Sequence, residues 1–248
     1  MGLKSVFLPS AAPMLNDQST ASLKIDLVAK ILFGTVALLS AASLTALGLR
    51  FYGGYEYAYG FVPLFEVDGE GNIPTYFSSM LHLTSAVLLT MITIAARQRQ
   101  NPGWKKWAGL AVIFVAASID EASSIHELLT YPMREILGTH GVLYFAWLVP
   151  AILLLIVAAL FYWPFFRKLP KTTFVGFMIA ATVFLSGAVG MEFLGGWFAD
   201  SKGVEALEFC LATEVEEFLE MTGAVIFIRT LLLYIGQHVG RFRISFDS

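Results

Sequence analysis

The sequence is poor in cysteine and in charged residues. Its single cysteine, Cys210, excludes an intrachain disulfide framework and any cysteine-rich zinc or iron–sulfur site. Charged residues make up 14% of the chain, against about 25% in an ordinary soluble domain, while hydrophobic residues make up 57%. One water-soluble core cannot bury so much apolar surface. The composition therefore predicts an all-α polytopic membrane protein, with the lipid bilayer as its first partner.

Other missing features narrow the function and the domain organisation. The net charge of −3 comes with no basic patch, which excludes nucleic acid as a partner. The N-terminal segment has no basic start followed by an apolar core, so it is not a secretory signal peptide. We expect residues 1–24 to form a flexible cytoplasmic tail, residues 25–238 the transmembrane domain, and residues 239–248 a short basic cytoplasmic tail.

Six apolar segments approach the length of about 20 residues that a helix needs to cross a bilayer. The fifth segment is interrupted by glycines, and the sixth begins as a polar helix before an apolar stretch at 221–235. The six predicted spans are residues 25–49, 76–96, 107–129, 142–163, 174–198 and 205–235. This pattern predicts a bundle of six transmembrane helices.

Basic residues mark one side of the membrane. The loops after the second and fourth spans and the C-terminal segment are rich in Lys and Arg, whereas the other loops hold few. The positive-inside rule then places both termini in the cytoplasm of a cell or inner membrane.

The stretch from Ser118 to Glu127 holds ionisable residues at an unusual depth. No Gly, Pro or basic residue separates it from the apolar run that starts at Trp107, so Asp120 would lie roughly 20 Å along the same helix. A carboxylate at such depth costs about 2.5–3.5 kcal/mol, which makes ionisable residues there functional candidates. The alternative is that the helix ends early and leaves Asp120, Glu121 and Glu127 in a solvated outer turn.

Helical spacing assigns these residues to faces. At about 100° per residue, Asp120 and Glu127 share one face, and His126 points about 120° away from Asp120. Glu216, Glu217 and Glu220 lie within an arc of about 100° on the sixth span. Ser78, His82 and Ser85 form a polar stripe on the second span, where His82 could simply bond to a neighbouring hydroxyl.

Acidic side chains from three spans fall in one outer layer. Outer-side cations are limited to Arg50, Arg134 and Lys202, so ion pairs cannot neutralise all of the carboxylates. A bound cation together with one or two shared protons is the interpretation that we favour; a water-filled vestibule or a basic partner is the alternative. The eight carboxylates are Asp120, Glu121, Glu127, Glu192, Glu214, Glu216, Glu217 and Glu220.

The sequence hypothesis is a divalent metal site in the outer half of the bilayer. Carboxylate and imidazole ligands suit zinc, iron or manganese. With Asp120, Glu127 and Glu217 as catalytic groups, the protein would be a metal-dependent hydrolase or oxidoreductase acting on a hydrophobic substrate. The candidate ligands are His82, Asp120, Glu121, Glu127, Glu192, Glu217 and Glu220. For Glu217 and Glu220 the competing interpretation is a hydrated first turn of a span that begins only at Met221.

Two other functions stay open at this stage. One is an accessory subunit that docks other membrane subunits through its acidic outer face. The other is a proton- or cation-coupled transporter in which the same carboxylates titrate.

Two family patterns are matched only in part. Ser78-x-x-x-His82, followed by an acidic residue in the next span, is similar to part of the pattern of membrane ceramidase-type zinc hydrolases. Those enzymes have seven spans and a late His-x-x-x-His, which is missing here. The Glu-x-x-His of dinuclear carboxylate bundles is missing as well.

Overall fold

The computed structural model describes residues 14–69 and 71–239, with side chains from residue 23 onward. Within these ranges the chain is almost wholly helical and contains no strand, which confirms the all-α prediction. Residues 1–13 and 240–248 of the predicted tails, together with Glu70, lie outside the described residues.

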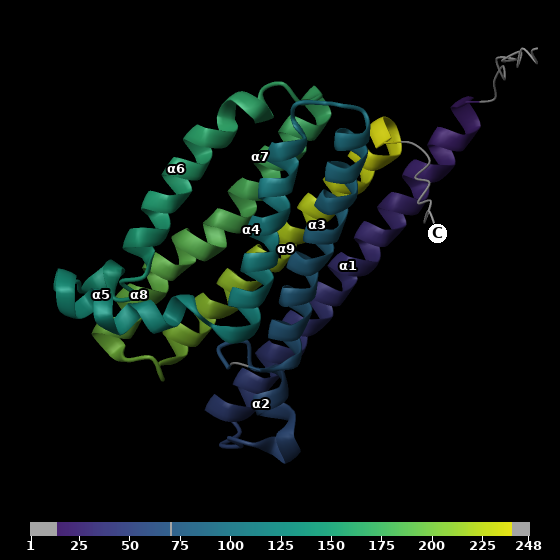
Figure 1. The fold of residues 1–248 in the computed structure, drawn as a ribbon. Coiled ribbons are helices and arrows are strands. Elements are labelled where there is room, and N and C mark those ends of the chain that lie inside the picture. The colour runs from purple at the N-terminus through teal and green to yellow at the C-terminus, as the bar shows by residue number, and fades with distance from the viewer. Residues whose placement is uncertain (1–13, 70, 240–248) are drawn as a thin grey trace, which may run out of the picture.

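Figure 1 shows a bundle of long helices with shorter ones gathered at one end. The long helices are α1 (Met14–Phe51), α3 (Ile73–Gln98), α4 (Trp104–Ser123), α6 (Leu148–Phe166), α7 (Lys171–Leu185), α8 (Glu192–Lys202) and α9 (Leu207–Tyr234). The short elements are α2 (Phe61–Phe65), α5 (Thr130–Leu137) and the single turns η1 (Ala58–Gly60), η2 (His126–Leu129) and η3 (Gly141–Leu143). Two segments, η4 (Ser186–Met191) and η5 (Ile235–Val239), are π-helical.

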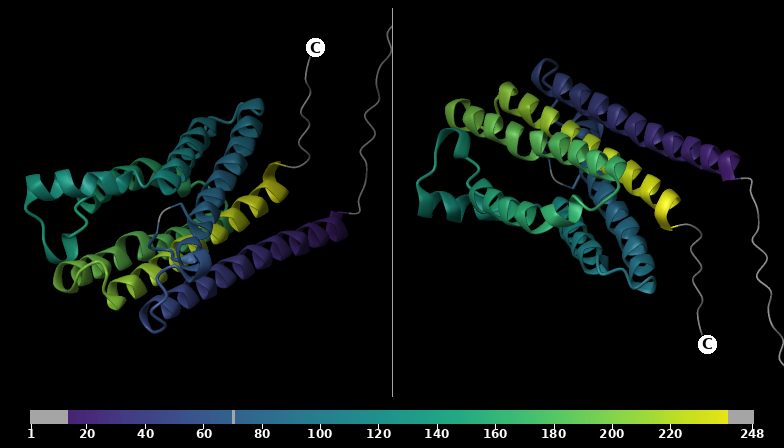
Figure 2. Two further views of the ribbon diagram at one scale, coloured as in Figure 1. Left: turned by 90° about the horizontal axis from the view of Figure 1, so that it is seen from below. Right: turned by 90° about the horizontal axis from the view of Figure 1, so that it is seen from above.

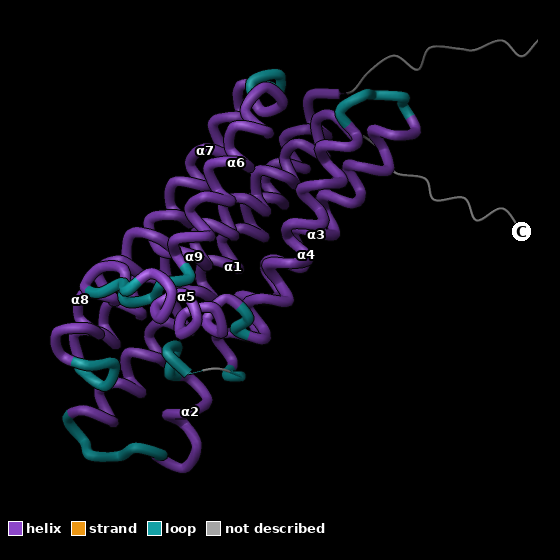
Figure 3. The backbone as a smooth tube through the Cα atoms, turned by 60° about the vertical axis from the view of Figure 1, so that its left-hand side comes forward, coloured by secondary structure: helices purple, strands orange, loops and turns teal. Residues whose placement is uncertain are grey.

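The number of membrane-spanning segments agrees with the sequence. Among the described residues, five helical segments are long and apolar enough to cross a membrane, and there are six if α4 and the bent segment after it are one span. The helices run side by side, and the loops lie at the two ends (Figure 3). The described start of α1 and the end of α9 lie at the same end of the bundle, with α2, α5 and α8 at the opposite end (Figure 1).

Helix α9 is the centre of the bundle. It packs against α1, α3, α7 and α8, and both views in Figure 2 place it between α1 and α3. One apolar core surrounds the fully buried Trp107 and includes Leu89 and Leu231. A second includes Val36 and Met221. Because α9 contributes to both cores, its position fixes the positions of the polar side chains on its first half.

Glycines let α7 and η4 approach α9 closely. A Cβ added at Gly223 of α9 would lie 2.7 Å from the backbone N of Phe184, and one added at Gly187 would lie 2.7 Å from the carbonyl oxygen of Glu216. Small residues of this kind are how membrane helices bring their backbones together. The π-helical turn η4 follows directly after α7, so the close approach also sets where Glu192 begins α8.

The third predicted span is wrong in its second half. Helix α4 ends at Ser123, and Ser124 takes a left-handed conformation with φ of 45°. The segment His126–Leu137 then leaves α4 at an angle of 78°. Asp120 and Glu127 are therefore not on one continuous helix face, and the alternative of an early helix end is correct for Glu127.

Candidate functional site

The candidate site lies where the last turn of α4, the first turn of α8 and the first half of α9 meet. Glu121 comes from α4, Glu192 opens α8, and α9 supplies Glu216, Glu217 and Glu220. We call these five residues the facing carboxylates, because each lies close enough to others of the set to repel them electrostatically. All five are half-buried.

The carboxyl groups of Glu192 and Glu216 lie within hydrogen-bonding reach of each other across the α8–α9 interface. The indole Nε1 of Trp147, just before α6, donates a hydrogen bond to Glu192 Oε1 at 2.8 Å. An ionised carboxylate can only accept hydrogen bonds. A hydrogen bond between two carboxyl groups therefore needs a proton between them, and Trp147 fixes the orientation of one partner.

Glu217 and Glu220 lie among other acids. The groups that act on Glu217 are Glu121, Glu214, Glu192 and Asp68, and those that act on Glu220 include Glu217 and Glu121. Glu121 lies within hydrogen-bonding reach of Ser78 on α3, so this carboxylate also has a hydroxyl neighbour.

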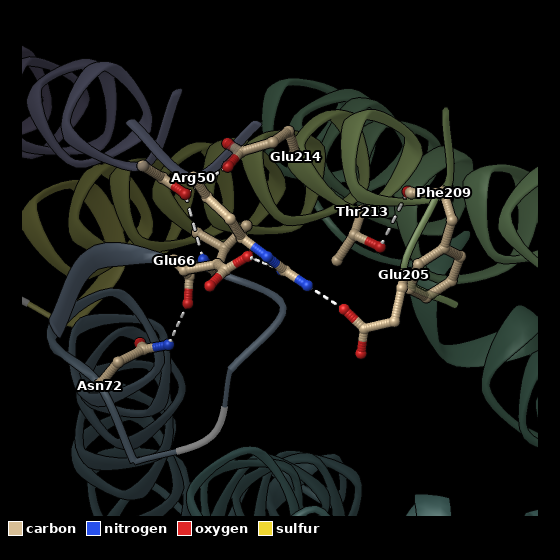
Figure 4. Close-up of polar contacts among 9 residues, drawn as sticks. Arg50, Glu66, Asn72, Glu205, Phe209, Thr213 and Glu214 are labelled. Atoms are coloured by element: carbon tan, nitrogen blue, oxygen red, sulfur yellow. Dashed lines mark hydrogen bonds and ion pairs between the residues drawn. The ribbon is translucent and has the colours of Figure 1, made fainter. Parts of the chain in front are cut away.

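Arg50, Arg134 and Lys202, the three cations that the sequence predicts on the outer side, are engaged elsewhere. Figure 4 shows Arg50 reaching both Glu66 and Glu205, which pair with it as ions. Lys202 pairs with Glu208 at 2.6 Å, and the guanidinium of Arg134 lies 4.0 Å from the ring centroid of Tyr144. These cations pair with other acids or with a ring instead of with the facing carboxylates.

Asp120 and His126 form a pair that helical spacing did not predict. Because α4 breaks at Ser124, the chain turns back, and both the backbone N–H and the ring Nδ1 of His126 reach Asp120, at 2.9 and 2.8 Å. A carboxylate accepts, so Nδ1 carries the hydrogen and Nε2 of the neutral ring keeps its lone pair. The prediction that His126 points away from Asp120 is wrong because it extended the helix past its end.

The histidine joins the pair to the Glu192 side of the site. The ring of His126 lies 4.5 Å from that of Trp147, centroid to centroid, and Trp147 bonds to Glu192. A continuous contact path therefore leads from Asp120 through His126 and Trp147 to Glu192, which lies beside Glu216.

His82 is deeply buried, with 3% of its surface exposed. Its ring lies between Phe114 of α4 and Phe184 of α7, at centroid distances of 6.0 and 5.7 Å. Its Nδ1 is buried and has no hydrogen-bond partner among the described residues. Ser85 bonds to the backbone of its own helix instead, so the expectation of a simple histidine–hydroxyl bond is not met at this nitrogen.

Glu127 and Glu214, two further acids considered in the sequence analysis, are not among the facing carboxylates. Glu127 is exposed on η2, beyond the break in α4. Glu214 is buried and accepts a hydrogen bond from Ser43 of α1, whose hydroxyl also accepts from the backbone N–H of Val67. Glu214 thus holds α1 and the α2–α3 loop against α9 (Figure 4). In the described part of the chain, no group of three or more His, Cys, Asp or Glu side chains is arranged to hold a metal ion.

Sequence reasoning missed Trp147 and the pairing of Ser79 with Ser118. The two serines join α3 to α4 through hydroxyl and carbonyl bonds of 2.8 and 3.0 Å. A tryptophan at the start of an apolar span is typical of an interfacial anchor, so its type alone did not mark it as a partner for Glu192.

Comparison with known proteins gives a family but no characterised relative. The model of a family described as "Domain of unknown function (DUF8692)" matches residues 31–235, which extend from α1 to the start of η5. No curated protein and no solved structure matches the chain.

Proposed function

Because this chain belongs to the DUF8692 family, whose description names no activity, we propose a function from the side chains of the site alone. We propose that it is a proton-coupled integral membrane protein in which the facing carboxylates bind and release a proton within the outer half of the bilayer. The observation that carries this proposal is that the carboxyl groups of Glu192 and Glu216 lie within hydrogen-bonding reach of each other.

Two features of the surroundings support a proton in this place. Arg50, Arg134 and Lys202 are occupied elsewhere, so a proton is the simplest positive charge that can offset the repulsion among the facing carboxylates. The contact path through Trp147 to His126 supplies a second group that can take up a proton, since the Nε2 lone pair of His126 is left over by its bond to Asp120.

The acids belong to three helices, α4, α8 and α9. Glu192 follows the π-helical turn η4, and π-turns are frequent at functional sites. Losing the shared proton would make Glu192 and Glu216 repel each other and would push α8 from α9. Such a separation would couple proton release to a change in helix packing. A proton-coupled transporter needs a coupling of this kind.

A proton-release titration tests the proposal. Purified protein in detergent is taken from pH 5 to pH 9, and the protons released per chain are counted for the wild type and for Glu216→Gln. We expect the variant to release about one proton fewer, because the amide cannot share a titrating proton. The matched control is Glu208→Gln, an acid on the same helix that pairs with Lys202 outside the site. Equal release by wild type and Glu216→Gln would refute the proposal.

A divalent metal centre is the second candidate. Within the part of the chain that the structure describes, Nδ1 of His82 has no hydrogen-bond partner and Glu217 and Glu220 have no basic partner, and both observations favour a metal. The ligands would come from the predicted set of His82, Asp120, Glu121, Glu127, Glu192, Glu217 and Glu220, and zinc, iron or manganese would suit them. Loading would require these side chains to move together. Elemental analysis of the purified wild type, Glu217→Gln and Glu208→Gln tests this. Metal in the wild type and in Glu208→Gln but not in Glu217→Gln would support a metal centre, and a metal-free wild type would refute it.

A further inference from the structure

A groove at the opposite end of the bundle lies between the start of α7 and the second half of α9. Its volume is about 500 Å³, within the range of about 300–1,000 Å³ typical of small-molecule sites. Lys171 and Thr172 line one end, and Val175 and Ile179 line the other, where Arg229 also lies because its neighbour Thr230 meets Gly176 across the α7–α9 contact. The groove therefore has a cationic end at Lys171 and a mostly apolar stretch that contains the ion-paired Arg229.

The polarity changes along the axis of α7. Lys171 is the first residue of this helix, and Ile179 lies eight residues further on, or about 12 Å along the axis. A ligand that follows the groove thus passes from the basic end of the bundle toward its apolar middle. A phospholipid has this same sequence of properties along its length.

Arg229 is held in place beside the apolar stretch of the groove. Its Nε and Nη2 both donate to Asp26 Oδ1 of α1, at 2.9 and 2.7 Å. The pair with Asp26 cancels one charge, so the net positive charge of the groove comes from Lys171. The fixed guanidinium still offers its remaining N–H groups as donors.

A second groove adjoins the first and shares Lys171. It measures about 470 Å³ and is lined by Trp163, Arg167, Leu169 and Phe174 in addition. Trp at the end of an apolar helix is typical of the membrane interface. Lys171 is thus flanked by a second cation and by an aromatic residue of the type that lies at the level of lipid headgroups.

We propose that these two grooves bind the phosphate headgroup of an anionic glycerophospholipid at Lys171, with an acyl chain along Val175 and Ile179. Basic pockets between transmembrane helices on the Lys/Arg-rich side are known to hold such headgroups. This site is independent of the facing carboxylates, which lie at the other end of α7–α8.

Native mass spectrometry of protein released from nanodiscs tests the assignment. The nanodiscs contain equal parts of phosphatidylglycerol and phosphatidylcholine. We expect the wild type to retain phosphatidylglycerol in preference to phosphatidylcholine. Lys171→Gln should retain about fivefold less phosphatidylglycerol than the wild type. Lys171→Arg keeps the charge and should retain the lipid.

The matched control is Lys105→Gln. Lys105 is an exposed lysine at the same end of the bundle, in the first turn of α4, and it lines neither groove. It should behave as the wild type. Equal retention of both lipids by the wild type, or equal loss in Lys105→Gln and Lys171→Gln, would overturn the proposal. Displacement of the lipid by inorganic phosphate at equal concentration would identify a soluble anion as the ligand and would also overturn it.

Discussion

Gly223→Ala should destabilise the protein, because the α7–α9 contact has no room for a methyl group. The added Cβ would lie 2.7, 2.8 and 2.9 Å from the N, Cβ and Cα atoms of Phe184. Two of these are backbone atoms, so no side-chain rotation relieves the clash. Restoring an ordinary contact of about 3.4 Å requires the helices to separate by about 0.5–0.7 Å.

The size of the effect follows from known costs of overpacking. Inserting a methyl group into a close-packed contact costs about 1–3 kcal/mol of the free energy of unfolding. For a chain of this length, each kcal/mol shifts the melting temperature by about 2–4 °C. We therefore expect Gly223→Ala to melt about 2–12 °C below the wild type.

Thermal unfolding in detergent, followed by intrinsic tryptophan fluorescence, measures this shift. Gly34→Ala is the matched control: Gly34 lies in α1, and a Cβ there meets nothing within 4 Å. Alanine is the better helix former by about 0.5–1 kcal/mol, so Gly34→Ala should melt at or above the wild-type temperature. If Gly223→Ala melts no lower than Gly34→Ala, the close α7–α9 approach does not exist and the placement of Glu192 beside Glu216 loses its support.

Three further substitutions probe the site and its surroundings. Trp147→Phe removes the donor to Glu192 and should lower the free energy of unfolding by about 1–3 kcal/mol, measured by denaturant titration, whereas an unchanged value would deny the bond. Asp120→Asn should abolish the preference of His126 for the Nδ1–H tautomer, which ¹⁵N NMR of histidine-labelled protein detects; an unaltered spectrum would contradict the pair. Desolvation and the neighbouring Glu66 raise the pKa of Asp68 to about 6. The folded protein thus holds more protons than the unfolded chain between about pH 4 and pH 6, and its stability falls as the pH rises through that window. Asp68→Asn should therefore raise the melting temperature at pH 7.5 but not at pH 4.5, and an equal change at both would refute the assignment.

The sequence was sufficient to predict the all-α class and the approximate spans. Apolar length and the distribution of Lys and Arg carry that information, because the bilayer imposes both. The common end of α1 and α9 agrees with an even number of crossings (Figure 1). The cytoplasmic location of that end stays a prediction, as do the docking of other membrane subunits and an enzymatic activity.

The break in α4 could not be predicted from periodicity. No Gly or Pro marks it, and the helix ends at a serine in a left-handed conformation, which few residues other than Gly, Asn and Asp adopt. Extending the helix through Ser124 placed Glu127 beside Asp120 and turned His126 away, and both placements are wrong. Acids on α8 and α9 were expected in one layer, and Glu192 does meet Glu216 there. The neighbour that each carboxylate contacts depends on how the helices pack against one another. The spacing of residues along a single helix carries no information about that packing.

Infrared spectroscopy of the carboxyl groups tests the shared proton most directly. A protonated carboxylic acid has a carbonyl stretch that an ionised carboxylate lacks, and the band shifts when the solvent is exchanged for ²H₂O. We predict this band for the wild type and for Glu208→Gln at pH 7, and its loss in Glu216→Gln. A wild-type spectrum in which every carboxyl group is ionised at pH 7 would contradict a proton held between Glu192 and Glu216.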